Sequence, residues 1–284
     1  MEPDLAVNLA PRHPRGLRLS NPVMVASGTF GPDGYGGRLP EGLDIQRLGA
    51  VVAKTATIRP RPGNPEPRWF PQSWKRSWQE GQRAFLNSVG LSNPGIESVL
   101  REKAPIWATW RVPVVLSIAG ETTQEFVELA SLAEGTPGIA ALELNLSCPN
   151  VDGGLYFGQN PDLAATTVRA VKAATTLPVL AKLTPNVTDI AAVAEAVAEA
   201  GADAISVINT LQGMAIDVAA RKPVLGAATG GLSGPAIKHV ALAMVYWVSQ
   251  RVDVPVIGLG GIFTATDALE FIMAGATAVQ IGTA

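Results

Sequence analysis

The sequence contains a single cysteine, Cys148, and only two histidines, His13 and His239, among its 284 residues. One cysteine excludes an internal disulfide framework and is compatible with a reducing cytosol. No histidine belongs to a group of acidic residues with metal-ligand spacing, and no serine has a histidine partner in the sequence pattern. We therefore expect neither a metal site nor a serine nucleophile.

Charge and long apolar segments are scarce as well. Charged residues make up 16% of the chain and the net charge is −2, so the basic surface that binds nucleic acid is absent. The N-terminus lacks a charged region followed by an apolar one, and Gly, Pro, Asp or Lys interrupts the most apolar windows. We expect no signal peptide, no transmembrane helix and a cytoplasmic location.

Short apolar runs recur along the whole chain, and most of them end in polar residues or glycine. The eight runs span residues 23–28, 50–55, 114–119, 139–144, 179–184, 204–210, 254–261 and 278–283. Segments with helical spacing of apolar residues lie between them, at 122–134, 161–175, 189–200, 235–252 and 265–274. Alternating strands and helices indicate an α/β fold, and eight runs predict a parallel (β/α)8 TIM barrel.

We expect residues 1–284 to form a single domain, with Asp189 and Thr264 as helix N-caps. Residues 17–19 are expected to form a short strand that plugs the base of the barrel. A long insertion loop at 58–85 is rich in Pro and Trp, which predicts a packed excursion that covers a site or contacts a partner. The sequence ends within a residue of the eighth run, so the final helix of the barrel is expected to be missing from this chain.

Polar residues gather at the expected carboxyl ends of the strands, where barrel enzymes carry their active sites. They are Ser27, Lys54, Thr55, Ser117, Asn145, Cys148, Lys182, Asn209, Thr210, Gly260, Gly261, Gly282 and Thr283. Pro149 stops a strand directly after Cys148, so the thiol is expected at the mouth of the fold. The alternative is a cysteine that serves as a small buried apolar residue.

Lys182 and the late glycine-rich loops indicate an anionic ligand. A lysine inside an apolar run needs a partner for its charge, and a bound anionic ring or phosphate would provide one. The alternative is a lysine whose stem runs along the wall to the solvent. Glycine-rich stretches at 230–234, 258–261 and 282–283 are expected to offer backbone N–H groups to phosphate at helix N-termini.

The segment Asn145-Leu146-Ser147-Cys148-Pro149-Asn150 resembles the signature of class 1 dihydroorotate dehydrogenases, flavin enzymes of pyrimidine biosynthesis built on a (β/α)8 barrel. Similar blocks in the family's order lie at 21–28, 60–68, 87–91, 182–187, 208–210 and 230–235. Details at 186–189 and 209–211 are most similar to the 1B subtype. That subtype pairs with an FAD and iron–sulfur electron-transfer subunit and passes electrons to NAD.

The resemblance implies FMN as cofactor and dihydroorotate as substrate, bound by a homodimeric enzyme. The implied FMN contacts are Ser27, Lys54, Thr55, Ser117, Asn145, Lys182, Ile208, Gly234, Gly260, Gly261, Gly282 and Thr283. The implied substrate contacts are Lys54, Asn87, Ser88, Val89, Gly90, Leu91, Asn145, Asn209 and Thr210. Cys148, with Lys54 as the other catalytic residue, would remove a proton from C5 while hydride passes from C6 to flavin N5.

Three other functions stay open on the sequence. A dihydropyrimidine dehydrogenase-like enzyme would reduce uracil or thymine, although Lys54 and the 87–91 segment suit a ring that bears a carboxylate. A tRNA dihydrouridine synthase would need a basic face for RNA, which a net charge of −2 does not favour. A barrel without catalytic activity, which serves as a subunit or scaffold, would fail to bind FMN. The electron acceptor, NAD through a partner or fumarate, is also left open.

Overall fold

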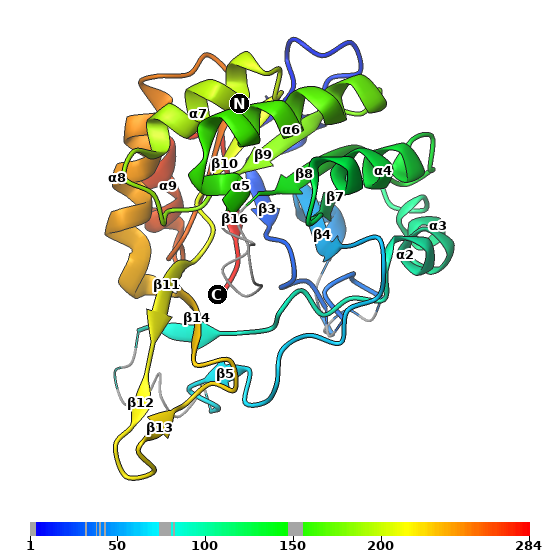
Figure 1. Cartoon of the computed structure of the whole chain (residues 1–284). Coiled ribbons are helices and arrows are strands. Elements are labelled where there is room, and N and C mark those ends of the chain that lie inside the picture. Colours follow the sequence, from blue (N-terminus) through cyan, green and yellow to red (C-terminus); the bar gives the residue numbers. More distant parts are fainter. Residues whose placement is uncertain are drawn as a thin grey trace.

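The apolar runs form parallel strands in the computed structural model, because a strand covered on both faces needs no polar side. The structure describes residues 4–31, 33–37, 39, 41–42, 44–73, 81, 83–146 and 156–284. Within these residues, eight parallel strands close into a barrel (Figure 1). In spatial order they are β3 (Val23–Val25), β4 (Ala50–Ala56), β7 (Val114–Ile118), β8 (Ala141–Asn145), β9 (Val179–Lys182), β10 (Ala204–Val207), β15 (Val256–Leu259) and β16 (Ala278–Ile281). The predicted TIM barrel is confirmed.

Helices cover the outside of the barrel (Figure 1). The five predicted helical segments correspond to α4 (Thr123–Ala133), α6 (Pro161–Ala174), α7 (Ile190–Glu199), α8 (Lys238–Ser249) and α9 (Ala265–Met273). Short helices that the apolar spacing did not indicate are α2 (Ile96–Glu102), α3 (Ala104–Trp107), α5 (Tyr156–Gln159) and the 3₁₀ turn η1 (Ile45–Arg47). Asp189 and Thr264 are N-caps as predicted, since each side chain accepts from backbone N–H groups of its own helix.

A hairpin closes the amino end of the barrel. Strand β1 (Val7–Asn8) pairs antiparallel with β2 (Arg18–Leu19). Leu17 and Leu19 are buried against Met24 and other apolar residues near the start of the barrel strands. The predicted plug at residues 17–19 is therefore confirmed, and it leaves the carboxyl end of the barrel as the open one.

Antiparallel strands lie beyond the carboxyl end of the barrel, below it in Figure 1. One sheet has the order β11 (Leu211–Met214), β14 (Thr229–Ser233), β6 (Phe85–Asn87) and β5 (Trp69–Phe70), and a second pairs β12 (Ile216–Asp217) with β13 (Lys222–Pro223). The glycine-rich stretch expected as a phosphate loop at 230–234 is mostly strand β14. Only its last residue, Gly234, precedes a helical turn, η2 (Pro235–Ile237). The stretch therefore forms a strand rather than a loop that opens a helix over its whole length, because Gly230 and Gly231 allow close approach of the paired strands.

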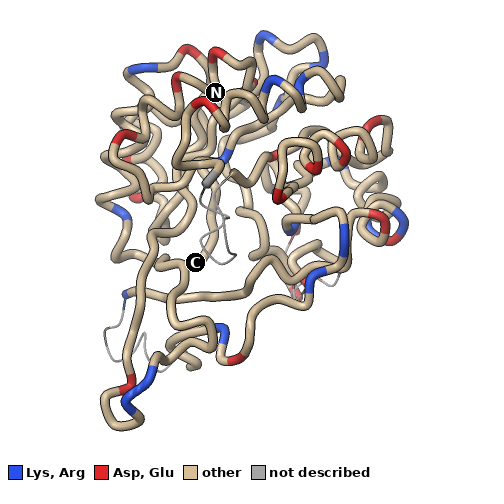
Figure 2. Tube along the Cα trace, in the orientation of Figure 1, with Lys and Arg blue, Asp and Glu red and all other residues tan. Residues whose placement is uncertain are grey.

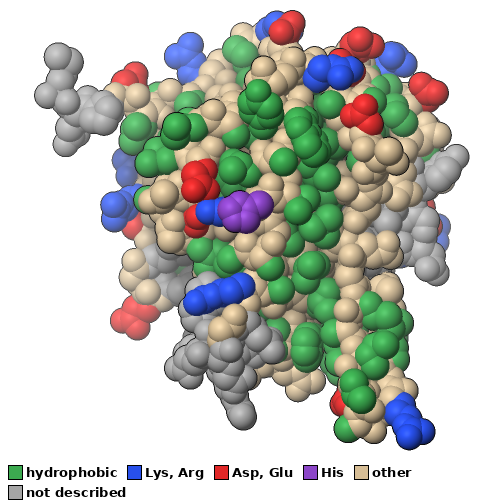
Figure 3. All heavy atoms as spheres, turned by 90° about the vertical axis from the view of Figure 1, so that its left-hand side faces the viewer, with side chains coloured by type: hydrophobic (Ala, Val, Ile, Leu, Met, Phe, Trp, Pro, Cys, Tyr) green, Lys and Arg blue, Asp and Glu red, His purple; other side chains and the backbone are tan. Residues whose placement is uncertain are grey.

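Charged residues lie mainly on the outer helices and loops and are sparse along the barrel strands (Figure 2). Figure 3 shows apolar side chains exposed on the side of the molecule that carries α8 and α9 and along the protruding antiparallel strands. They include Val240, Tyr246, Trp247, Leu269, Met273, Met214, Ile216 and Val218. Such patches are typical of surfaces that contact another protein.

Candidate active site

A cavity of about 250 Å³ lies at the carboxyl end of the barrel strands. The predicted site residues that line it are Ser27, Lys54, Thr55, Asn87, Val89, Leu91, Asn145, Lys182, Ile208, Asn209, Thr210, Gly260, Gly261, Gly282 and Thr283. Ser88, Gly90, Ser117 and Gly234 are not part of this lining. Cys148 lies outside the described residues.

Lys54 lies where strand β4 departs from regular pairing with β7. The register shifts between Ala53 and Ala56, and an irregularity of this kind redirects side chains. The Lys54 side chain passes over Gly28 and Gly34, where an added Cβ would lie 3.1 Å from Lys54 Nζ and 3.1 Å from Lys54 Cβ, respectively. The glycine-rich loop after β3 therefore makes room for an ammonium group at the cavity wall.

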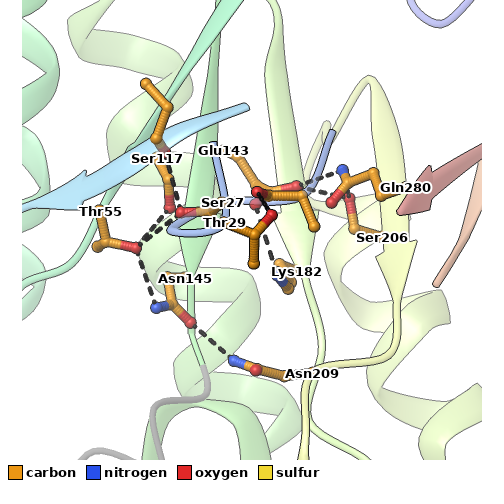
Figure 4. Close-up of polar contacts among 12 residues, drawn as sticks. Ser27, Thr29, Thr55, Ser117, Glu143, Asn145, Lys182, Ser206, Asn209 and Gln280 are labelled. Atoms are coloured by element: carbon orange, nitrogen blue, oxygen red, sulfur yellow. Dashed lines mark hydrogen bonds and ion pairs between the residues drawn. The ribbon is translucent and has the colours of Figure 1, made fainter. Parts of the chain in front are cut away.

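A row of hydroxyl and carboxamide groups links side chains on or just after five strands, β3, β4, β7, β8 and β10 (Figure 4). Thr55 Oγ1 lies 2.9 Å from Ser117 Oγ and 3.3 Å from Ser27 Oγ. Asn145 Nδ2 donates to Thr55 Oγ1 at 3.4 Å, and Asn209 Nδ2 donates to Asn145 Oδ1 at 3.2 Å. Ser117 thus contacts Thr55 from the neighbouring strand β7 without lining the cavity, whereas Asn145 and Asn209 present donors and acceptors to the cavity.

Beneath the cavity, a buried carboxylate was missed by the sequence analysis. Glu143 on β8 has no exposed surface, and its Oε2 accepts from Ser206 Oγ at 2.9 Å and from Gln280 Nε2 at 2.8 Å. Lys182 Nζ lies 4.0 Å from the other oxygen, Oε1. The available signal was a charged or carboxamide residue in the middle of an apolar strand, at Glu143 and Gln280, which burial makes costly without partners.

The turn between β15 and α9 brings backbone close to the cavity. Gly260 and Gly261 both have positive φ, and a Cβ on Gly261 would lie 2.8 Å from the backbone nitrogen of Lys238. Asp267 Oδ2 accepts from the backbone nitrogen of Phe263, another cavity residue, at 3.0 Å. The Lys238 ammonium, 2.7 Å from Asp267 Oδ1, holds the pKa of that carboxyl far below its usual range. The turn is therefore fixed by an ionised residue of α9.

The 87–91 segment contributes alternate residues to the cavity. Asn87, Val89 and Leu91 line it, whereas Ser88 is fully buried and accepts from Asn64 Nδ2 at 2.8 Å. Gly90 has a positive φ and faces Asn64, so it serves the local turn. The structure thus brings part of the predicted substrate segment to the site and places the rest behind it.

The residues that the structure describes contain no group of three His, Cys, Asp or Glu side chains that could hold a metal ion. None of the helices in the same residues is long and apolar enough to cross a membrane.

Comparisons with known proteins agree with the geometry. A family model described as dihydroorotate dehydrogenase matches residues 12–284. The dihydroorotate dehydrogenase B (NAD(+)) catalytic subunit of Pelobacter propionicus is 52% identical over 285 residues, 100% of this chain and 88% of that protein. The protein of the same description from Desulforudis audaxviator is 53% identical over 95% of this chain and 84% of that protein. The crystal structure of an Eimeria tenella protein, described as DHODH in complex with ferulenol, has a TM-score of 0.78 at 23% identity and covers 99% of this chain and 79% of that one, which supports the fold.

Proposed function

This chain belongs to the dihydroorotate dehydrogenase family, and from that premise we propose how its cavity performs the reaction. The family oxidises dihydroorotate to orotate in pyrimidine biosynthesis and is flavin-dependent. We propose that the flavin is FMN and that both FMN and the pyrimidine ring bind in the cavity at the carboxyl ends of the strands.

The observation that carries the proposal is the convergence of two lysines and two carboxamides on one cavity. Lys54, Lys182, Asn145 and Asn209 come from positions that are far apart in the sequence, yet all four line it. Two ammonium groups suit a substrate carboxylate and an electron-rich cofactor. Carboxamides supply both donors and acceptors, as the alternating polar edge of a pyrimidine dione requires.

The residues present also fit a flavin mononucleotide. Gly260 and Gly261 bring backbone close to the cavity wall, where a Cβ on Gly260 would lie 2.7 Å from Ala241 Cβ. Bare backbone of this kind, next to the last strands of a barrel, suits a phosphate group. We assign FMN binding to Ser27, Lys54, Thr55, Asn145, Lys182, Ile208, Gly260, Gly261, Gly282 and Thr283. Ser117 contacts Thr55 directly, so we assign it the role of supporting the FMN contact of Thr55. Gly234 stays a predicted FMN contact that rests on the sequence.

For the substrate, we assign the carboxylate to Lys54 and the ring edges to Asn145, Asn209 and Thr210. The 87–91 segment would cover the other side of the ring. Cys148 is the proposed general base, which accepts the proton from C5 of dihydroorotate. The bound flavin would supply the acceptor for the hydride.

We also propose the electron route and assembly of the 1B subtype. The names of the two relatives from Pelobacter propionicus and Desulforudis audaxviator refer to a catalytic subunit and to NAD(+). An FAD and iron–sulfur partner subunit would then carry electrons from this chain to NAD, and the catalytic chain would form a homodimer in the cytoplasm. The exposed apolar side chains of α8, α9 and the antiparallel strands support contacts with other proteins.

The experiment that tests the proposal is an absorbance spectrum of the purified protein, followed by anaerobic addition of dihydroorotate. We expect a flavin spectrum that bleaches. The Cys148→Ala variant should keep the flavin and lose most of its turnover, whereas Ser131→Ala, on the outer helix α4, should behave as the wild type. A flavin that dihydroorotate leaves oxidised, while reduced enzyme is reoxidised by uracil, would replace this function with the dihydropyrimidine dehydrogenase-like one. Reduction of Cys148→Ala at the wild-type rate would remove the assigned base.

A further inference from the structure

The buried Glu143 has a hydrogen-bonding pattern that fixes the direction of its side chain. An ionised carboxylate only accepts hydrogen bonds, so Ser206 must present its O–H and Gln280 its amide nitrogen to Oε2. Gln280 Nε2 also lies 3.4 Å from Ser206 Oγ, which holds the two donors together. Both donors therefore bond to the same oxygen of Glu143, Oε2.

The second oxygen, Glu143 Oε1, has no hydrogen-bond partner although it is fully buried. It lies 4.0 Å from Lys182 Nζ, on the adjacent strand β9. A buried carboxylate without a nearby cation would be very costly, so this ion pair explains why the charge is tolerated. Lys182 lines the cavity and Glu143 does not, so the cation stands between the carboxylate and the ligand site (Figure 4).

We propose that Glu143 is a positioning residue that holds Lys182 at the cavity floor and offsets its charge, and thereby sets the reduction potential of the flavin. The inference rests on the proposed function, because it requires a flavin beside Lys182. Reduction of a flavin adds negative charge, so an ammonium group favours the reduced form and a carboxylate favours the oxidised form. Glu143 thus keeps the potential lower than Lys182 alone would set it.

The test compares flavin potentials in a set of charge variants of the purified holoenzyme, measured by equilibration with a reference dye. Glu143→Gln keeps the shape and removes the charge, so it should raise the preference for reduced over oxidised flavin by roughly tenfold. A tenfold change corresponds to ~30 mV for a two-electron couple. Lys182→Met should shift the potential in the opposite direction, and Glu143→Gln should raise it again in the Lys182→Met background.

Glu134→Gln is the matched control. Glu134 also accepts several hydrogen bonds, from Thr175 and Thr176, but it lies at the end of α4 and is not part of the cavity lining. Its loss should leave the flavin potential at the wild-type value. If Glu143 had only a structural role, its replacement would change stability and leave the potential unchanged, as in this control.

The possible outcomes distinguish a failure of the role proposed for Glu143 from a failure of the proposed function. A Glu143→Gln enzyme with bound flavin and an unchanged or lowered potential overturns the role of Glu143 and leaves the proposed function intact. If Glu143→Gln alone does not fold, the comparison moves to Lys182→Met with and without Glu143→Gln, where the same upward shift in potential is required. Wild-type protein that binds no flavin under reconstitution overturns the proposed function and this inference with it.

Discussion

Replacement of Asp267 by alanine should weaken both the fold and the cofactor site, because one carboxylate joins the two. Asp267 Oδ2 accepts from the backbone nitrogens of Phe263 at 3.0 Å and Thr264 at 2.8 Å, which completes a capping box at the start of α9. Oδ1 accepts from Lys238 Nζ at 2.7 Å, on the neighbouring helix α8. Without this side chain, the turn that carries Gly261 and Phe263 loses its anchor.

The expected loss of stability in Asp267→Ala follows from the two kinds of contact that the Asp267 side chain makes. Loss of a helix cap costs about 1 kcal/mol. The ion pair with Lys238 is partly exposed, with 18% and 14% of the two side chains accessible, so screening reduces its contribution to about 1 kcal/mol. Together they predict a loss of about 2 kcal/mol in the free energy of unfolding, or a fall in melting temperature of about 4–8 °C.

Thermal unfolding of the apoprotein and FMN titration measure the two effects separately. Asp189→Ala is the control, because Asp189 caps α7 through the backbone nitrogens of Ala191 and Ala192 and does not line the cavity. It should lower stability by about 1 kcal/mol and leave the FMN affinity unchanged. Equal losses in the two variants, or an unchanged FMN affinity in Asp267→Ala, would refute the reasoning.

Two further predictions concern pH and substrate. Hydrogen bonds lower the folded-state pKa of Asp267, chiefly through Lys238, and that of Glu134, chiefly through Thr175. Their stabilisation is therefore complete above about pH 5 and is lost as the pH falls through the unfolded-state and then the folded-state pKa values. Urea unfolding between pH 7 and pH 3 should show this decline, and a smaller one in Asp267→Ala. Asn209→Ala should raise the KM for dihydroorotate by about tenfold at unchanged FMN content, and a wild-type KM would contradict the assignment of that carboxamide.

The barrel could be predicted from the sequence because its strands are covered on both faces and therefore read as continuous apolar runs. The antiparallel sheet beyond the barrel could not be predicted from the sequence. Two of the five residues of its strand β14 are glycine, and the strand pairs with β6, so that Gly231 lies opposite Asn87, far away in the sequence. Pairing over such a separation leaves no periodic signal in either segment. The described part of the 58–85 loop adds Trp69 to this sheet and to the cavity lining.

The cavity residues at strand ends were predictable for a geometric reason, since parallel strands of a closed barrel all end on one side. Lys54, Asn145 and Lys182 follow directly from that rule and line the cavity. The strand-end rule did not indicate Glu143 and Gln280, because they precede the strand ends and their hydrogen-bond partners lie on other strands. The role of Cys148 rests on the sequence, and it stays a prediction that the Cys148→Ala variant tests.

The position of Glu143 also follows from the alternation of side chains along a strand. Residues two apart on a strand point to the same side, so three alternate strands of this barrel present successive levels to its interior. The first level, next to the plugged end, consists of Ala141, Ala204 and Ala278. The second consists of Glu143, Ser206 and Gln280, and the third, next to the cavity, consists of Asn145, Ile208 and Gly282. The first level is small and apolar and packs with the N-terminal plug, and the third lines the cavity. On the polar second level, Gln280 lines the cavity and Glu143 does not, so the proposed effect of the Glu143 charge on a ligand would act without contact.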